Sequence, residues 1–242
     1  PDAVRDVLDA WACMSRAVRH LPCLMLANYY VGPTFLGPAH PLMPHKGAAI
    51  PDAFCARLFY LQEGEETFSV RQIEEARTCL VLTELPERVE RIGVSVEDDE
   101  ADAWEIVIRE YAAAAREAEQ AGAHLQAAAK HARTDMDREH LREETLLTEL
   151  IHRTWLTCEN TLRFLRARQD FEATGGDASR QEMLRLAAAE RENALAAKPI
   201  YVQAPWLDIA MRTDGKYASC VDMIDAKVGW LDDFLQRTPS EA

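Results

Sequence analysis

Apolar residues recur at helical spacing along most of the chain. Residues 2–20 carry them at intervals of three and four, namely Val4, Val7, Leu8, Trp11, Met14 and Val18. This spacing predicts an amphipathic helix, and Leu21-Pro22 is expected to end it because proline cannot continue a helix.

The same periodicity, together with capping patterns, predicts five further helices and leaves the assignment of one segment open. A capping-box pattern, Ser69 followed by Gln72, starts a helix that stops near Pro86. Ser179 and Glu182 open another, which we expect to end or kink near Pro199. Residues 51–68 fit a short helix or an extended piece. The predicted helices after the first span residues 69–85, 99–132, 136–172, 179–199 and 219–236.

The pattern assigns the chain to the all-α class. Residues 200–218 look irregular, and no pair of alternating strands joined by a hairpin turn is evident. We predict an irregular bundle of five to seven helices forming one domain over residues 1–242. Because the chain starts at Pro1 without a methionine or a leader, we expect it to be a piece of a longer multidomain protein.

A long loop interrupts the helical pattern near the N-terminus. Residues 28–47, NYYVGPTFLGPAHPLMPHKG, contain three glycines and four prolines among aromatic and aliphatic residues. Loops of this length without secondary structure are uncommon in compact domains and are usually functional or disordered. The stretch is too apolar for a solvated linker, so we expect it to pack against the bundle or a neighbouring domain.

Composition excludes several classes of partner. The 242 residues include 27 Lys and Arg against 41 Asp and Glu, a formal charge of −14, which disfavours nucleic acid and anionic membranes as partners. No run of about 18 apolar residues predicts a membrane span. The six cysteines show no C-x-x-C spacing, and their apolar surroundings favour a reducing, cytoplasmic compartment, although their even number leaves disulfides open.

The only metal-like motif is Glu149-Leu-Ile-His152. Its spacing places a carboxylate and an imidazole on one helix face, as in carboxylate-bridged di-metal bundles. Such a site needs a second motif of this kind, whereas Asp137-Arg-Glu-His140 offers only D-x-x-H on the same helix. We therefore predict no metal and no cofactor, and keep a stand-alone metal-dependent bundle enzyme as the alternative.

Five segments follow one another along the chain in a characteristic order, namely AWACMSRAVRHLPC, YYVGPTFLGPAHPL, FLRARQDFE, AAERENAL and DMIDAKVGWLDDFL. In this order they resemble a helical region that follows a (β/α)₈ barrel in large glycoside-hydrolase-like proteins. The Y-x-G-P-x-x-x-G-P-A-x-P loop is the most specific of them. The matching residues are Trp11, Ser15, Ala17, Tyr30, Gly32, Pro33, Gly37, Pro38, Ala39, Pro41, Arg168, Asp170, Glu190, Asn193 and Lys227.

The resemblance implies that catalytic carboxylates lie on the barrel, and that this chain is its non-catalytic helical companion. The expected partner is the barrel domain of the same parent protein, with carbohydrate as a second candidate. The loop would line a substrate cleft or contact the barrel through Tyr29, Tyr30, Gly32, Pro33, Gly37, Pro38 and His40. Arg168, Glu190 and Asn193 would support it as buried polar groups. A protein-interaction bundle remains a third possibility.

Overall fold

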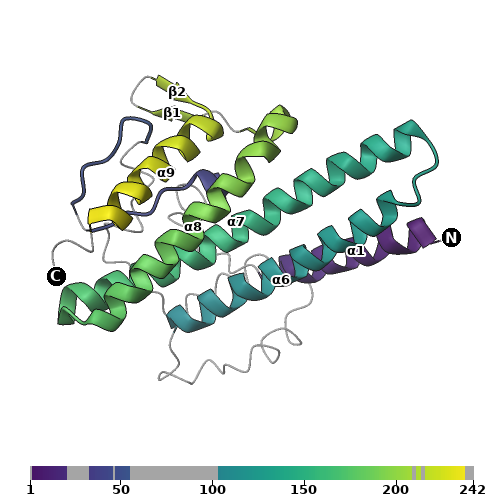
Figure 1. Ribbon diagram of the computed structural model, residues 1–242. Helices are drawn as coiled ribbons and strands as arrows, with labels where there is room; N and C mark the ends of the chain where they lie inside the picture. Colours follow the sequence, from purple (N-terminus) through teal and green to yellow (C-terminus); the bar gives the residue numbers. More distant parts are fainter. Residues whose placement is uncertain are drawn as a thin grey trace.

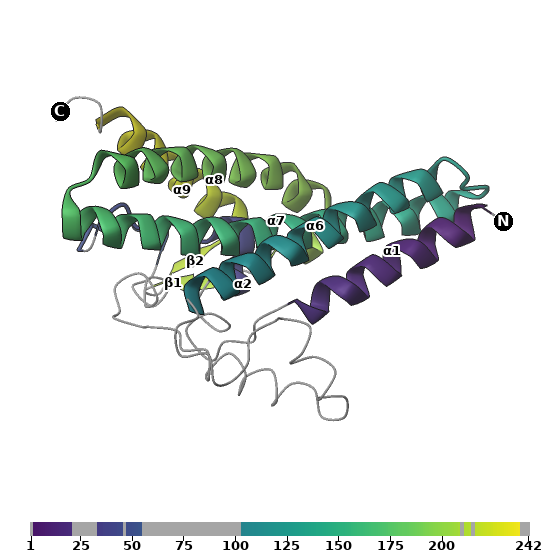
Figure 2. The same ribbon diagram turned by 90° about the horizontal axis from the view of Figure 1, so that it is seen from below.

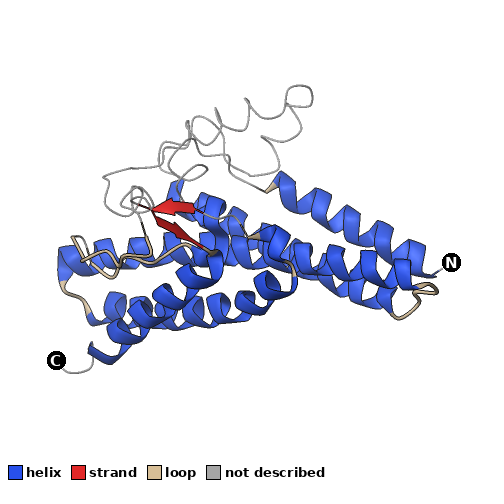
Figure 3. Ribbon diagram, turned by 90° about the horizontal axis from the view of Figure 1, so that it is seen from above, coloured by secondary structure: helices blue, strands red, loops and turns tan. Residues whose placement is uncertain are grey.

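The computed structural model describes residues 2–20, 33–45, 47–54, 103–208, 211–213 and 216–237. Long helices dominate this part of the chain, which confirms the all-α prediction (Figures 1 and 3). The predicted helix over residues 69–85 and the loop residues Tyr29, Tyr30 and Gly32 lie outside it.

Two long helices, α6 (Ala103–Ala129) and α7 (Asp135–Thr174), pack side by side and are joined by a short connection. The Thr134 side chain caps α7 by accepting a hydrogen bond from the Asp137 backbone N–H, and the Asp137 carboxylate accepts one from the Thr134 N–H. This reciprocal pair satisfies two of the backbone donors that a helix start leaves open. Helix α7 thus begins at Asp135, one residue before the start of the helix predicted over residues 136–172.

Helix α1 (Asp2–Arg19) packs along α6 at the N-terminal end of α7 (Figure 2). It turns its small residues inward, with Ala10, Cys13 and Ala17 buried. They face the alanine-rich α6, where Ala114, Ala118 and Ala121 are also buried. Small side chains on both helices allow close approach.

Helix α8 (Asp177–Gln203) runs back along the C-terminal half of α7. Gly175, with a φ of 66°, ends α7 in the left-handed conformation, and α8 starts two residues later, before the predicted Ser179. We predicted that this helix ends or kinks near Pro199; it does not end there, because α8 continues to Gln203. Pro199 is exposed, so water can satisfy the Leu195 carbonyl that loses its helical partner.

The chain closes with α9 (Cys220–Arg237), which packs on α8. Between them lie the 3₁₀ turn η4 (Pro205–Leu207) and an antiparallel pair, β1 (Met211–Thr213) and β2 (Lys216–Ala218). The prediction that the chain contains no strand pair was therefore wrong. Each strand has only three residues, so no alternation was available to reveal it; the Asp-Gly sequence between them is typical of hairpins.

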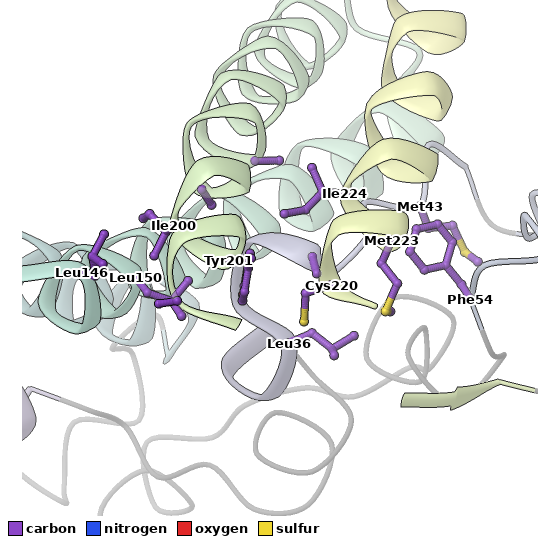
Figure 4. Close-up of a cluster of buried hydrophobic side chains, with 14 of the residues drawn as sticks. Leu36, Met43, Phe54, Leu146, Leu150, Ile200, Tyr201, Cys220, Met223 and Ile224 are labelled. Carbon is purple, nitrogen blue, oxygen red and sulfur yellow. The ribbon is translucent and has the colours of Figure 1, made fainter. Parts of the chain in front are cut away.

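The described part of the proline loop is buried in the bundle. It contains the short helix α2 (Pro33–Leu36) and the 3₁₀ turn η1 (Gly37–Ala39), both packed on α7. Every residue from Leu36 to Pro44 is buried. Figure 4 shows Leu36 and Met43 within an apolar cluster that α8 and α9 complete with Ile200, Tyr201, Cys220, Met223 and Ile224.

None of the helices in the described part of the chain has the length and hydropathy needed to cross a bilayer.

Replacing Gly37 by alanine should destabilise the fold by about 2–4 kcal/mol. Gly37 has a φ of 53°, and a Cβ there would overlap the Thr154 hydroxyl on α7. Gly47→Ala is the matched control, since Gly47 also has a positive φ, 73°, but no atom near its Cβ position. It should cost about 1 kcal/mol. Urea unfolding measures both, and equal losses would show that the contact with Thr154 is unimportant.

Candidate functional site

Several buried polar side chains of the described residues gather beneath the proline loop. Three of them, His40, Glu190 and Lys227, are fully buried although all three carry ionisable groups. They come from the loop, α8 and α9, so the folded structure brings together residues that are far apart in sequence. Such groups are expensive to bury unless they are hydrogen-bonded or paired.

Glu190 lies at the centre of this polar network. Its Oε1 accepts hydrogen bonds from the Lys227 ammonium at 2.6 Å and the Thr157 hydroxyl at 2.7 Å. Its Oε2 accepts one from the Asn160 amide at 2.7 Å. One cation and donors from α7 thus compensate the carboxylate, which offsets the cost of removing a charged group from water.

Asn193 lies one turn further along α8 and joins the same network. Its amide nitrogen donates to the Arg153 carbonyl and to the Thr157 hydroxyl, both at 3.0 Å. The spacing of three residues from Glu190 puts both side chains on the face of α8 that packs on α7. Together they fix the register of these two helices.

Lys227 connects the network to the loop. Its ammonium donates to the Pro38 carbonyl at 2.9 Å as well as to Glu190. Burial lowers the pKa of Lys227, while the Glu190 carboxylate acts to raise it. One side chain on α9 therefore holds both α8 and the backbone of η1.

Arg168 provides a second attachment for the loop. It is 3% exposed, and its Nη1 donates to the Met43 carbonyl at 3.0 Å. Its Nε lies 3.7 Å from the Glu172 carboxylate, one turn further along α7. Two buried cations thus bind two carbonyls of the loop, five residues apart.

His40 lies between these attachments and is fully buried. Burial, and secondarily the positive charge of Lys227, lower its pKa to about 3. The imidazole is therefore neutral near pH 7, and its side chain does not reach the surface. A direct role for His40 in contacting a sugar or another domain does not fit this position.

The predicted site residues fall into three groups: some are buried in the bundle, some lie outside the described residues, and some belong to the polar network. Pro33, Gly37, Pro38 and His40, predicted to contact a substrate or a neighbouring domain, are buried in the bundle. Tyr29, Tyr30 and Gly32 lie outside the described residues. Arg168, Glu190 and Asn193 lie in or beside the polar network, and the first two reach the loop backbone directly or through Lys227.

Sequence reasoning missed the role of three network residues, Lys227, Thr157 and Asn160. A signal existed for Lys227, which falls on the apolar stripe of α9 together with Ile224 and Leu231. A lysine in that register indicates a buried, paired ammonium. The partners on α7 had no comparable signal, because threonine and asparagine are common on helix surfaces.

Glu149 and His152 do not converge on a metal site. The Glu149 carboxylate accepts hydrogen bonds from Arg153, and His152 Nδ1 is 2.9 Å from the Ala115 carbonyl on α6. Within the described ranges, no group of three or more His, Cys, Asp or Glu side chains is arranged to hold a metal ion. His152 thus contacts α6, whereas Glu149 pairs with a residue of its own helix.

The network's chemistry is suited to support rather than to catalysis. Its carboxylate has its oxygens engaged by donors, and the nearby Cys158 thiol is fully buried, with burial raising its pKa to about 12. A thiol in that state is not a nucleophile at neutral pH.

No protein-family model, curated protein sequence or solved structure matches this chain.

Replacing Lys227 by methionine should lower the free energy of unfolding by about 3–5 kcal/mol, because Glu190 would keep a buried charge without its counter-ion. The double variant Lys227→Met/Glu190→Gln should lose less than the sum of the single changes. Lys198→Met is the matched control: Lys198 joins the same two helices through Asp225, but at the surface. It should cost at most about 1 kcal/mol. Equal losses for both lysines in urea unfolding would refute the central role of Lys227.

Stability should depend on pH through His40. The unfolded chain protonates this imidazole below about pH 6.5, whereas the folded chain does so only near pH 3. The contribution of the neutral, buried His40 to the free energy of unfolding is thus complete above pH 6.5. It is lost as the pH falls toward 3, by about 1.4 kcal/mol per pH unit.

The variant His40→Asn should remove this component from the slope of unfolding free energy against pH between 6 and 4.5. Substitution of the exposed His140 by asparagine serves as the control for losing a surface imidazole. Identical slopes for the His40 variant and the wild type would contradict the assignment.

Proposed function

We propose that this chain is a non-catalytic helical companion domain of a carbohydrate-active, glycosidase-like protein, and that it packs against the (β/α)₈ barrel of the same parent protein. The observation that carries the proposal is the outer face of α1. Four large apolar side chains there are more than half exposed: Val4 at 66%, Leu8 at 55%, Trp11 at 52% and Val18 at 59%.

These four residues form one continuous stripe. They follow one another at intervals of four, three and seven residues, which keeps them in line over about 21 Å of helix. An amphipathic helix normally turns such a stripe toward a core. Since α1 turns its small residues toward α6 instead, its large apolar side chains are available to another surface.

A groove of about 790 Å³ adjoins this stripe, between α1 and the end of α6 with the start of α7. Val4, Leu8 and Trp11 form one wall, and Leu125 and Leu141 line it from the other helices. Its polar lining includes His131, Asp137, His140 and Glu144. An apolar centre with a polar rim is the usual anatomy of an interface between folded domains.

The resemblance supports the choice of partner, since it implies a barrel in the same parent protein. In such a protein the catalytic groups would lie on the barrel loops. The engagement of Glu190, Lys227 and Arg168 in holding the proline loop agrees with a supporting domain.

The coding sequence upstream of this segment should encode several hundred residues of alternating strand and helix pattern. Co-expressed with that region, the chain should co-purify with it, and the variant Leu8→Glu/Trp11→Glu should not. Val202→Glu is the control, because Val202 is 64% exposed on α8, away from the stripe. Its co-purification should match the wild type.

Two results would overturn the proposal. One is an upstream sequence without a barrel pattern. The other is turnover of aryl glycosides by the isolated chain that a single carboxylate substitution within it abolishes.

A further inference from the structure

A cavity of about 640 Å³ lies at the opposite end of the molecule from the α1 stripe, where α7 ends and α8 begins. Its walls come from α7, α8, α9 and the end of the proline loop, which contributes Pro44 and His45. Its volume falls in the range of small-molecule sites. Arg168 lines it as well, so the contact that holds the loop also shapes this wall.

Three aromatic side chains line the cavity: Phe171 on α7, with Trp230 and Phe234 on α9. Two of them pack against a further aromatic ring. Trp230 stacks on Phe54 with a centroid distance of 6.4 Å, and Phe234 meets Phe164 edge-on at 6.0 Å. Aromatic rings fixed in this way present preorganised apolar surface on which the C–H face of a sugar ring can lie.

The three arginines that line the cavity differ in the hydrogen bonds and ion pairs that they form. Arg168 donates to the Met43 carbonyl, and Arg237 pairs with Asp233 at 3.1 Å. The Arg180 side chain forms no ion pair or hydrogen bond with any other described residue, and it is partly buried in the lining. A guanidinium in that position matches the two oxygens of a carboxylate.

Carboxylates complete the lining. Glu172, Asp177 and Asp233 face the same cavity and are hydrogen-bond acceptors for hydroxyl groups. The combination of aromatic surface, acceptors for hydroxyls and one uncommitted guanidinium fits a ligand that has an apolar face, several hydroxyls and one negative charge.

We infer that this cavity binds an acidic saccharide, a pyranose unit that carries a carboxylate, with the sugar ring against the aromatic side chains and the carboxylate on Arg180. This gives the domain a ligand of its own and does not depend on the barrel, so the isolated chain is sufficient to test it. Failure here would leave the companion role standing, and loss of barrel binding would leave this site standing.

The test is isothermal titration of the 242-residue chain with three probes: methyl β-D-glucuronide, methyl β-D-glucoside and benzoate. The glucuronide should bind with a Kd of about 1 mM or tighter. The neutral glucoside should bind at least about tenfold more weakly, a factor that corresponds to about 1.4 kcal/mol. Benzoate, which has the charge but no hydroxyls, should also bind at least about tenfold more weakly than the glucuronide.

Arg180→Ala should weaken glucuronide binding about tenfold or more and leave glucoside binding unchanged. The control is Arg185→Ala on the same helix, an exposed residue paired with Glu182 outside the cavity, which should bind like the wild type. Circular dichroism checks that both variants are folded. Equal affinity for glucuronide and glucoside, tighter binding of benzoate, no saturable glucuronide binding, or equal effects of the two substitutions would each overturn the inference.

Discussion

The buried ion pair between Glu190 and Lys227 is the interaction on which the arrangement of the C-terminal half depends. It joins α8 to α9 with an N–O distance of 2.6 Å between fully buried side chains. Desolvating two charges opposes folding, and their attraction offsets this only when the remaining donors and acceptors are satisfied. Thr157, Asn160 and the Pro38 carbonyl meet that condition, which ties the pair to one relative placement of four elements.

The composition of the loop follows from its position inside the bundle. A buried backbone segment must satisfy every N–H and C=O group, and loops usually avoid that demand by lying on the surface. Proline has no N–H, so the four prolines between Pro33 and Pro44 reduce the number of donors to be satisfied. The Pro38 and Met43 carbonyls are satisfied by the two buried cations. The polar network therefore satisfies the loop carbonyls, and the prolines of the loop reduce the number of N–H groups that need a partner.

The helices were predictable because helical periodicity and capping are local, as at Thr134 and Gly175. The face that each helix turns toward its neighbours was harder to predict. The hydrophobic pattern of α1 favours burial of Leu8 and Trp11, yet close packing against the alanines of α6 selects the face with Ala10 and Ala17. Glu190, Asn193 and Arg168 were identified through a resemblance, whereas their partners depend on tertiary proximity. Asn160 is an example of a residue whose role could not be predicted, since nothing near it in the sequence indicates that it binds the carboxylate of Glu190, thirty residues away.

The 40 residues of α7 run the whole length of the described bundle (Figure 1). The groove beside α1 lies at the start of α7, and the aromatic cavity lies at its end. Leu141 lies in the first and Phe171 in the second, a separation of about 45 Å along the helix axis. A ligand of the size of one sugar ring in the cavity therefore does not reach the residues that line the groove. If the domain docks through α1 and binds a saccharide in the cavity, as proposed, α7 would set the distance between the saccharide and the docked surface.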